Sequence, residues 1–334
     1  MSHGAPHAEP SAGRPPRIAL FGLGGVGRAF LEIAGERPGA LKLVAAADSR
    51  GAVMGDLDPG DILERKAAGR VAGSGGVDAG RLIAEVEPDI VVDTVSCDFA
   101  SGEPSLSILR AALDSGRAAV TANKAPLARA WSVLAGDADR ARRIGYAAAA
   151  GAALPAVAVA RALRREDDVA SLEAVLTGTT TFVLEAIAAG ASVEDAIRGA
   201  QAAGIAEPDP SIDLGGWDTA AKVVILANTL WPDGLGLDTV DVSGIEAIDA
   251  GEVRTGTARL VGRAERTASG VRARVGVLRL EDDHPLARLR GSEKGVVFRA
   301  PGIGEVVVTG GRSHPRGAAG AAFGDVLELA GSLA

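Results

Sequence analysis

Apolar runs alternate with amphipathic segments along the first half of the chain. The apolar runs predict strands at 17–21, 41–49, 88–96 and 117–124. Apolar positions with helical spacing predict helices between them, at 26–39, 61–69 and 105–116. Strands that alternate with helices in this order predict an α/β fold, a doubly wound parallel sheet with helices on both faces.

The pattern changes after about Gly145. Residues 192–230 are mostly helical around a polar loop, "AEPDPSIDLGGWD" at 206–218. Strand-like pieces follow at 255–265, 270–280 and 295–310, and a helix closes the chain. This order predicts a second α+β domain with a mixed sheet.

Composition and charge limit the functions that the chain can have. Its 334 residues are 47% hydrophobic, enough for the cores of two domains. The net charge of -8 argues against a nucleic-acid partner, and no apolar run approaches the roughly 20 residues of a membrane span. The single cysteine, Cys97, allows no internal disulfide. With no secretory signal at the N-terminus, we expect a cytoplasmic protein without a membrane partner.

A glycine loop, "GLGGVG", follows the first predicted strand and opens the first predicted helix. Gly22 permits the tight turn, Gly24 a close approach of the backbone to a pyrophosphate, and Gly27 close packing of helix on strand. The free N–H groups of a helix start that includes Gly25 and Val26 suit phosphate oxygens. The loop predicts a Rossmann-type dinucleotide site.

Two residues at and just beyond the end of the second predicted strand bear on the choice of cofactor. Asp48 lies about 20 residues past the glycine loop, where an acid binds the ribose hydroxyls of NAD. Arg50 is suited to neutralise the 2′-phosphate of NADP. The sequence leaves NAD and NADP open.

We therefore expect four segments along the chain. Residues 1–16 form a disordered tail, 17–145 the dinucleotide-binding domain, and 146–316 a substrate and dimerisation domain. The C-terminal helix, 317–334, is expected to pack back on the first domain.

Candidate chemistry gathers in two stretches. Lys124 follows a predicted strand, at the edge where open α/β sheets bind ligands. Asp218 and Lys222 are four residues apart, so they share a face of one helix. Such a pair can orient a substrate hydroxyl and transfer a proton, or can be an ordinary ion pair on a helix surface. Carboxylates without histidine give no strong signal for a transition metal, and we expect none.

Several stretches together resemble the homoserine dehydrogenase family. They are "GLGGVG", "ADSRG", "SGEPSLSILRAALDSGRAAVTANKAPLA", "LTGTTTFVLEAI" and "AGIAEPDPSIDLGGWDTAAKVVILAN". The resemblance implies reversible NAD(P)H-dependent reduction of L-aspartate 4-semialdehyde to L-homoserine, on the route to threonine and methionine. It also implies a homodimer, which the apolar stretch starting at Tyr146 supports.

The resemblance assigns roles to individual residues. Lys222 and Lys124 look like the two active-site lysines, with Asp218 as the acid beside them. Glu207 and Asp213 look like substrate carboxylates that suit an ammonium group, and Thr179 like a threonine that lines the substrate. Val95 and Ser96 fall on the nicotinamide side. We expect Lys222 to donate the proton, because Asp218 lies one helical turn before it.

The chain departs from the family pattern at three places. Ala147 replaces a glutamate that helps bind a monovalent cation in many members, leaving only the backbone carbonyls of Ala150, Ala152 and Leu154. "TGTTT" (177–181) replaces "NGTTN", and Arg312, Ser313 and His314 replace small residues in a loop near the cofactor. These departures keep two alternatives open: a diverged paralogue that reduces another small carbonyl compound, and a dinucleotide-binding protein without turnover.

Overall fold

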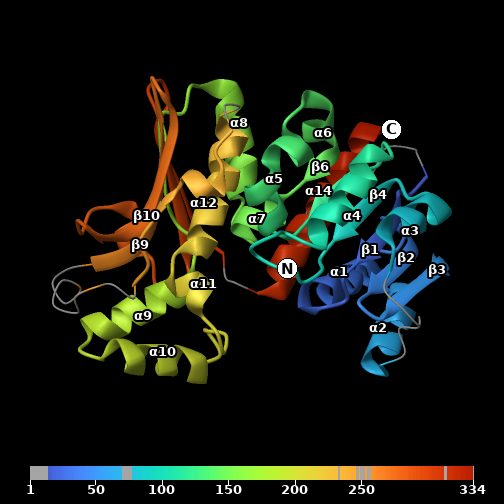
Figure 1. Ribbon diagram of the computed structural model, residues 1–334, viewed down its shortest axis with the longest axis horizontal. Helices are drawn as coiled ribbons and strands as arrows, with labels where there is room; N and C mark the ends of the chain where they lie inside the picture. Colours follow the sequence, from blue (N-terminus) through green and yellow to red (C-terminus); the bar gives the residue numbers. More distant parts are fainter. Residues whose placement is uncertain are drawn as a thin grey trace, which may run out of the picture.

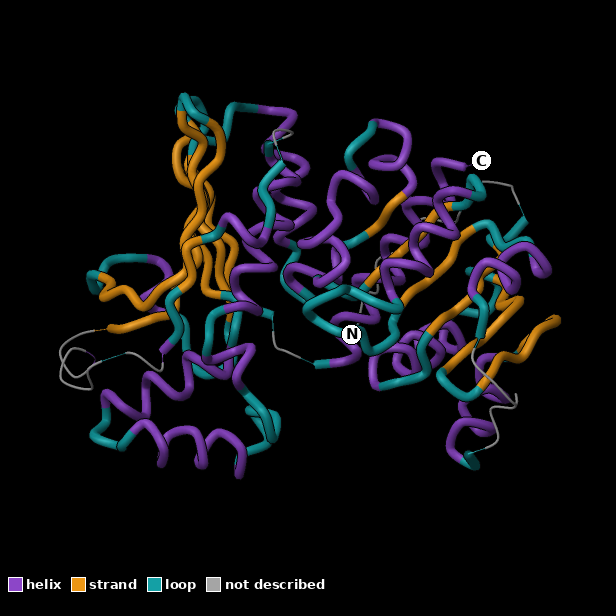
Figure 2. The backbone as a smooth tube through the Cα atoms, in the orientation of Figure 1, coloured by secondary structure: helices purple, strands orange, loops and turns teal. Residues whose placement is uncertain are grey.

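The computed structural model describes residues 14–69, 77–231, 234–245, 248, 253, 257–311 and 314–333. Its strands form two six-stranded sheets, each accompanied by helices (Figure 1). Figure 2 shows the strands in two separate groups with helices between them. The predicted fold class, a Rossmann-type sheet plus a second α+β unit, is confirmed.

The first sheet has the strand order β3-β2-β1-β4-β5-β6. Its strands are β1 (Arg17–Phe21), β2 (Lys42–Asp48), β3 (Gly51–Leu57), β4 (Ile90–Asp93), β5 (Ala118–Thr121) and β6 (Ile144–Gly145). Its helices are α1 (Gly25–Glu36), α2 (Pro59–Ala67), α3 (Ala79–Val86), α4 (Ser105–Asp114), α5 (Ala125–Ala135) and α6 (Ala138–Arg143). Only the edge strand β3 is antiparallel to its neighbour.

Both faces of this sheet are buried, because successive residues of each strand point to opposite sides. Ile18 and Leu20 belong to the core formed with α1 and the last helix, α14 (Pro315–Leu333). Ala19 and Phe21 belong to the core formed with α3 and α4. Apolar residues in consecutive positions therefore produce the continuous runs seen in the sequence.

The last helix joins the two halves of the chain. α14 packs on α1, where the rings of Phe30 and Phe323 lie 5.4 Å apart. Its buried Asp325 accepts a hydrogen bond from the backbone N–H of Ala147 (2.8 Å), at the start of the second half. Burial raises the pKa of this carboxyl to about 6.

The second sheet has the order β12-β11-β7-β9-β10-β8 and is mixed, since β8 alone is parallel to its neighbour. Its strands are β7 (Ser171–Val175), β8 (Asp241–Val242), β9 (Thr257–Thr267), β10 (Gly270–Leu280), β11 (Lys294–Ala300) and β12 (Gly304–Gly310). The helices of this half are α7 (Ala147–Gly151), α8 (Ala156–Glu166), α9 (Gly178–Ala188), α10 (Val193–Ala202), α11 (Ser211–Leu214) and α12 (Trp217–Leu230), with short 3₁₀ turns at Leu237–Thr239 and Pro285–Arg288. Both α9 and α12 pack on β9. α12 is buried on nearly its whole circumference, as a helix with apolar residues on all sides must be.

The structure differs from the sequence prediction at several points. β3, α3 and α11 were not predicted; β3 lacks an alternating pattern and contains Gly55 at a positive φ. Arg14, expected in the disordered tail, forms a two-point ion pair with Asp89, whose carboxylate also accepts the backbone N–H of Arg17. The domain boundaries at 145 and 316 stay a prediction. No helix in the described ranges is long and apolar enough to cross a membrane.

Candidate active site

Two neighbouring cavities open at the carboxyl ends of the first sheet's strands. The first, of about 680 Å³, is lined by the glycine loop, Asp48 and the end of β4. The second, of about 480 Å³, extends from the glycine loop to α12. Gly24, Thr94, Val95 and Ser96 line both cavities. One continuous groove therefore passes from the glycine loop to Asp218, with Val95 and Ser96 at the junction.

The three spaced glycines of the loop meet different requirements. A Cβ on Gly22 would lie 2.4 Å from the carbonyl carbon of Thr94, and one on Gly27 would lie 1.9 Å from the oxygen of Gly22. These two glycines are therefore required by the fold. A Cβ on Gly24 would meet no atom within 4 Å, since it would project into the cavity. That open space, beside the N-terminus of α1, fits a dinucleotide pyrophosphate.

The acid that ends β2, Asp48, is held by a lysine. Nζ of Lys66, on α2, lies 2.5 Å from Oδ2 of Asp48, and the backbone N–H of Arg50 donates to Oδ1 at 2.8 Å. Burial acts to raise the pKa of Asp48, but these hydrogen bonds outweigh it and lower the pKa. Asp48 and Lys66 line the first cavity, whereas the side chain of Arg50 does not.

A carboxylate between two ammonium groups forms the centre of the second cavity. Nζ of Lys124 lies 2.9 Å from Oδ1 of Asp218, and Nζ of Lys222 lies 2.6 Å from Oδ2. Lys222 also donates to the carbonyl of Leu176, and Thr177 donates to Oδ2 of Asp218 at 2.8 Å. The sequence-predicted trio thus meets at one point, although Lys124 precedes Asp218 by 94 positions.

The charges of this cluster stabilise one another. Burial acts to raise the pKa of Asp218, but the ammonium groups of Lys222 and Lys124 outweigh it and hold that pKa below its usual range. The carboxylate of Asp218 in turn raises the pKa of Lys124 against the opposing effect of burial. Lys124 is therefore an ammonium group at neutral pH and can donate a proton.

The two lysines differ in their access to the cavity. Lys124 lines it, with 33% of its side chain exposed. Lys222 does not line it and is 15% exposed, because its ammonium group lies behind Asp218 against the carbonyl of Leu176. The sequence predicts Lys222 as the proton donor. In the structure, Lys124 is the lysine that lines the second cavity.

The expected substrate residues lie at different depths. Asp213 and the exposed Glu207 line the cavity. Thr179 does not; it is buried and donates to Oδ2 of Asp213 at 2.9 Å. Burial and the neighbouring Asp218 raise the pKa of Asp213. Thr179 therefore acts on the cavity through Asp213, while Asp209, which was noted only as part of the loop, joins the lining.

One fully buried carboxylate, Asp93, was not predicted from the sequence. Its Oδ2 accepts hydrogen bonds from Ser105, Thr121 (2.7 Å) and Asn123 (3.0 Å), and burial raises its pKa. Asn123 also donates to the carbonyl of Val95 (2.9 Å). This network fixes the ends of β4 and β5, and with them the positions of Val95 and Lys124. Its only sequence signal was a polar residue at the end of each strand.

Two of the three departures from the family pattern, the "TGTTT" segment and the loop that ends at His314, include residues that the structure describes. Thr177 and Thr181 are buried, and their hydroxyls bond to Asp218 and to the carbonyl of Thr177 instead of facing the cavity. Arg312 and Ser313 lie outside the described residues. His314 accepts the N–H of Arg316, and Pro315 lies close to Gly25. The "TGTTT" segment therefore supports the acid of the cluster.

Cys97 and His284 lie outside the lysine–aspartate cluster. Burial, with Asp93 nearby, raises the pKa of the Cys97 thiol to about 11, so this thiol stays protonated. His284 lies 3.0 Å from Glu173 in a cluster of charges on the second sheet. Across the described ranges, no three His, Cys, Asp or Glu side chains are grouped so as to hold a metal ion.

The glycine loop, the groove and the lysine–aspartate cluster define a dinucleotide-dependent oxidoreductase. Comparisons with known proteins agree. The family model for homoserine dehydrogenase matches residues 155–327, and the chain belongs to this family. The NAD(+)-dependent homoserine dehydrogenase of Pseudomonas canavaninivorans is 33% identical over 337 residues, covering 94% of this chain and 96% of that protein.

Two further relatives give the same result. The homoserine dehydrogenase of Sulfurisphaera tokodaii is 28% identical, covering 94% of this chain and 98% of that protein. A solved hyperthermophilic archaeal homoserine dehydrogenase in complex with NADPH has a TM-score of 0.82 and 27% identity, covering 95% of this chain and 98% of that one. The chain is an NAD(P)-dependent oxidoreductase.

Proposed function

We infer that the chain interconverts L-homoserine and L-aspartate 4-semialdehyde with NAD or NADP. The observation that carries this inference is the cluster of Lys124, Asp218 and Lys222 at the end of the dinucleotide groove. The cofactor, when bound, supplies or accepts the hydride. The side chains of the second cavity bind the substrate and move its proton.

We propose Lys124 as the proton donor for the aldehyde oxygen. Its ammonium group lines the cavity, and Asp218 holds it in place at 2.9 Å. As an aldehyde is reduced, negative charge builds on its oxygen, and a positioned acid meets that charge. Lys222 fixes the other oxygen of Asp218 and is a positioning residue. In the oxidative direction Lys124 must first lose its proton, so this direction should be faster at alkaline pH.

We propose that Asp213 and Glu207 bind the α-ammonium group of the substrate. Both line the cavity, and Thr179 holds Asp213 in place. Carboxylates pair with an ammonium group, so a substrate without one leaves them uncompensated. This arrangement favours an amino-acid alcohol over a plain alcohol.

We propose that the protein is a cytoplasmic homodimer. Most of the apolar stretch after Gly145, which suggested a dimer surface, is buried within the chain itself and gives little support. The support that remains is family membership together with exposed Val307, 41% accessible, on β12 of the second sheet. Sedimentation at micromolar concentration tests the dimer, which a monomer mass would exclude.

A substrate comparison tests the proposed activity. Purified protein is assayed for reduction of NAD and of NADP with L-homoserine and, separately, with 4-hydroxybutyrate, which lacks the ammonium group. We expect turnover of L-homoserine, with a kcat/KM at least about 100-fold above that of 4-hydroxybutyrate. Equal kcat/KM values for the two compounds would exclude recognition of the ammonium group by Asp213 and Glu207. Turnover of neither compound would favour the non-catalytic alternative.

A further inference from the structure

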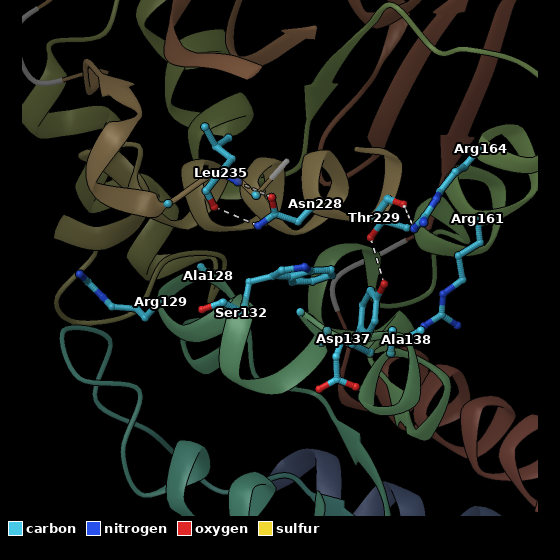
Figure 3. A pocket seen from close by; sticks show the side chains of 17 residues that line it. Ala128, Arg129, Ser132, Asp137, Ala138, Arg161, Arg164, Asn228, Thr229 and Leu235 are labelled. Carbon is cyan, nitrogen blue, oxygen red and sulfur yellow. Dashed lines mark hydrogen bonds between the residues drawn. The ribbon is translucent and has the colours of Figure 1, made fainter. Parts of the chain in front are cut away.

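A third cavity, of about 660 Å³, lies between helices of the two halves of the chain (Figure 3). α5 and α6 form one side, and α8 and α12 form the other. It shares no lining residue with the two cavities of the active site. The proposed reaction makes no use of it.

The cavity carries positive charge from α8. The guanidinium of Arg161 lies 4.5 Å from the ring centre of Tyr146, and Arg164 donates to the carbonyl of Thr229 at 3.2 Å. Figure 3 shows both arginines on one side of the cavity, with Arg164 directed at Thr229. Arg161 also donates to the carbonyl of Ile144 at 3.3 Å. Burial acts to lower the pKa of Arg161, but Tyr146 and the more distant Asp325 and Glu328 outweigh it and raise that pKa.

Two polar side chains on the other walls, Asp137 and Asn228, already have partners. Oδ1 of Asp137, the acid that lines the cavity, accepts two backbone N–H groups at the start of α6, and its Oδ2 lies 3.6 Å from Arg140. The amide of Asn228 bonds to both backbone groups of Leu235. The cavity therefore offers guanidinium groups to an anion and no free carboxylate to an ammonium group.

The remaining wall is aromatic and apolar. The rings of Trp131 and Tyr146 pack edge to face at 5.4 Å, and Ala128, Ala135 and Ala138 lie beside them in the lining. The cavity thus combines an aromatic and alanine wall with the guanidinium groups of α8, a combination that suits a carboxylate with an apolar body. We propose that this cavity binds a small carboxylate with an apolar body and no ammonium group, such as a branched 2-oxo acid, as an effector.

Two of the four helices that line the cavity, α5 and α12, also carry the lysine–aspartate cluster. Lys124 is the N-cap of α5, and Asp218 and Lys222 lie in the first half of α12. Trp131 and Asn228, on the same two helices, line the cavity. α5 is kinked between the two regions, at Ala130, where φ is −134° and ψ is 39°. A ligand that prefers one spacing of these helices changes the population in which Lys124 and Asp218 meet.

Calorimetry on the full-length protein saturated with NAD tests the site. The probes are 4-methyl-2-oxopentanoate and L-leucine, which share a branched body and differ in the ammonium group. The test variant is Arg164→Gln, and the control is Arg165→Gln, an exposed neighbour on α8 that does not line the cavity. We expect wild type to bind the oxo acid more tightly than L-leucine. The affinity for the oxo acid should fall at least about tenfold in Arg164→Gln and stay within about twofold of wild type in Arg165→Gln.

Several results would overturn the proposal. The first is that wild type does not bind the oxo acid at concentrations up to about 10 mM. The others are that the two variants bind the oxo acid with equal affinity, or that L-leucine binds more tightly than the oxo acid. Binding that leaves the rate with L-homoserine unchanged, or that is competitive with L-homoserine, would overturn the effector role. The calorimetric readout needs no turnover, so its outcome is independent of the dehydrogenase activity.

Discussion

Lys124 and Asp218 form an ion pair that joins the two halves of the chain. Nζ of Lys124, at the start of α5, lies 2.9 Å from Oδ1 of Asp218 at the start of α12. The other oxygen of Asp218 is occupied by Lys222. A single carboxylate thus compensates two ammonium groups and connects the dinucleotide groove to the helix at the centre of the second half.

Asp218→Asn should therefore impair both catalysis and stability. It leaves two partly buried ammonium groups without a counter-charge, which should lower the free energy of unfolding by at least about 2 kcal/mol. It also releases Lys124, so kcat should fall by about 10²–10⁴-fold. Asp209→Asn, an exposed carboxylate of the same cavity, is the control and should keep the stability of the wild type. Thermal unfolding measures the loss of stability, and initial rates measure the loss of kcat. A stability and a kcat equal to those of wild type in Asp218→Asn would refute the prediction.

The glycine loop allows fold and binding to be separated. Gly24→Val should fold normally, because its Cβ meets no atom within 4 Å, but should lose NAD binding, since the side chain would fill the place of the pyrophosphate. Gly35→Ala, an open position in α1, is the control and should bind NAD as wild type does. Calorimetry with NAD measures the difference. Unchanged affinity of Gly24→Val would place the cofactor elsewhere.

Buried Lys294 predicts a specific dependence of stability on pH. Burial, with Lys222 and Lys124 nearby, lowers its pKa from 10.5 to about 8. Between these two values the unfolded chain binds the proton more tightly, so this lysine makes stability rise with pH through that window. Lys294→Met should remove the rise and be more stable than wild type at neutral pH. The control is Lys42→Met, at an exposed lysine that pairs with Asp56, and this variant should retain the rise of stability with pH.

Unfolding in denaturant at pH values on both sides of about 8 measures this effect. Parallel curves for wild type and Lys294→Met would contradict the assignment.

Turnover should not respond specifically to Na⁺ or K⁺. Ala147 offers no carboxylate, and the ammonium group of Lys294 donates to the carbonyl of Gly151, between Ala150 and Ala152. A second cation beside that ammonium group would be repelled. Rates measured at constant ionic strength while one ion replaces the other test this. Saturable activation by either ion would show that backbone carbonyls suffice.

Local patterns were enough to predict much of the fold and of the site. The glycine loop was evident because strand, loop and helix are contiguous, and Asp218 and Lys222 because four residues make about one helical turn. The network of Asp93 was missed because its donors come from α4, β5 and the loop after it. The different access of the two lysines depends on how α12 packs beneath β7, which spacing along the chain does not reveal.

We propose that Lys124, held by Asp218, exchanges the proton in the interconversion of L-homoserine and L-aspartate 4-semialdehyde. The direct measurement is the initial rate of nicotinamide reduction with L-homoserine at alkaline pH, for wild type, Lys124→Ala and Asp209→Asn. We expect turnover by wild type and Asp209→Asn, and a kcat at least about 100-fold lower in Lys124→Ala with NAD affinity retained. Near-normal turnover by Lys124→Ala, or no turnover of L-homoserine by the wild type, would contradict it.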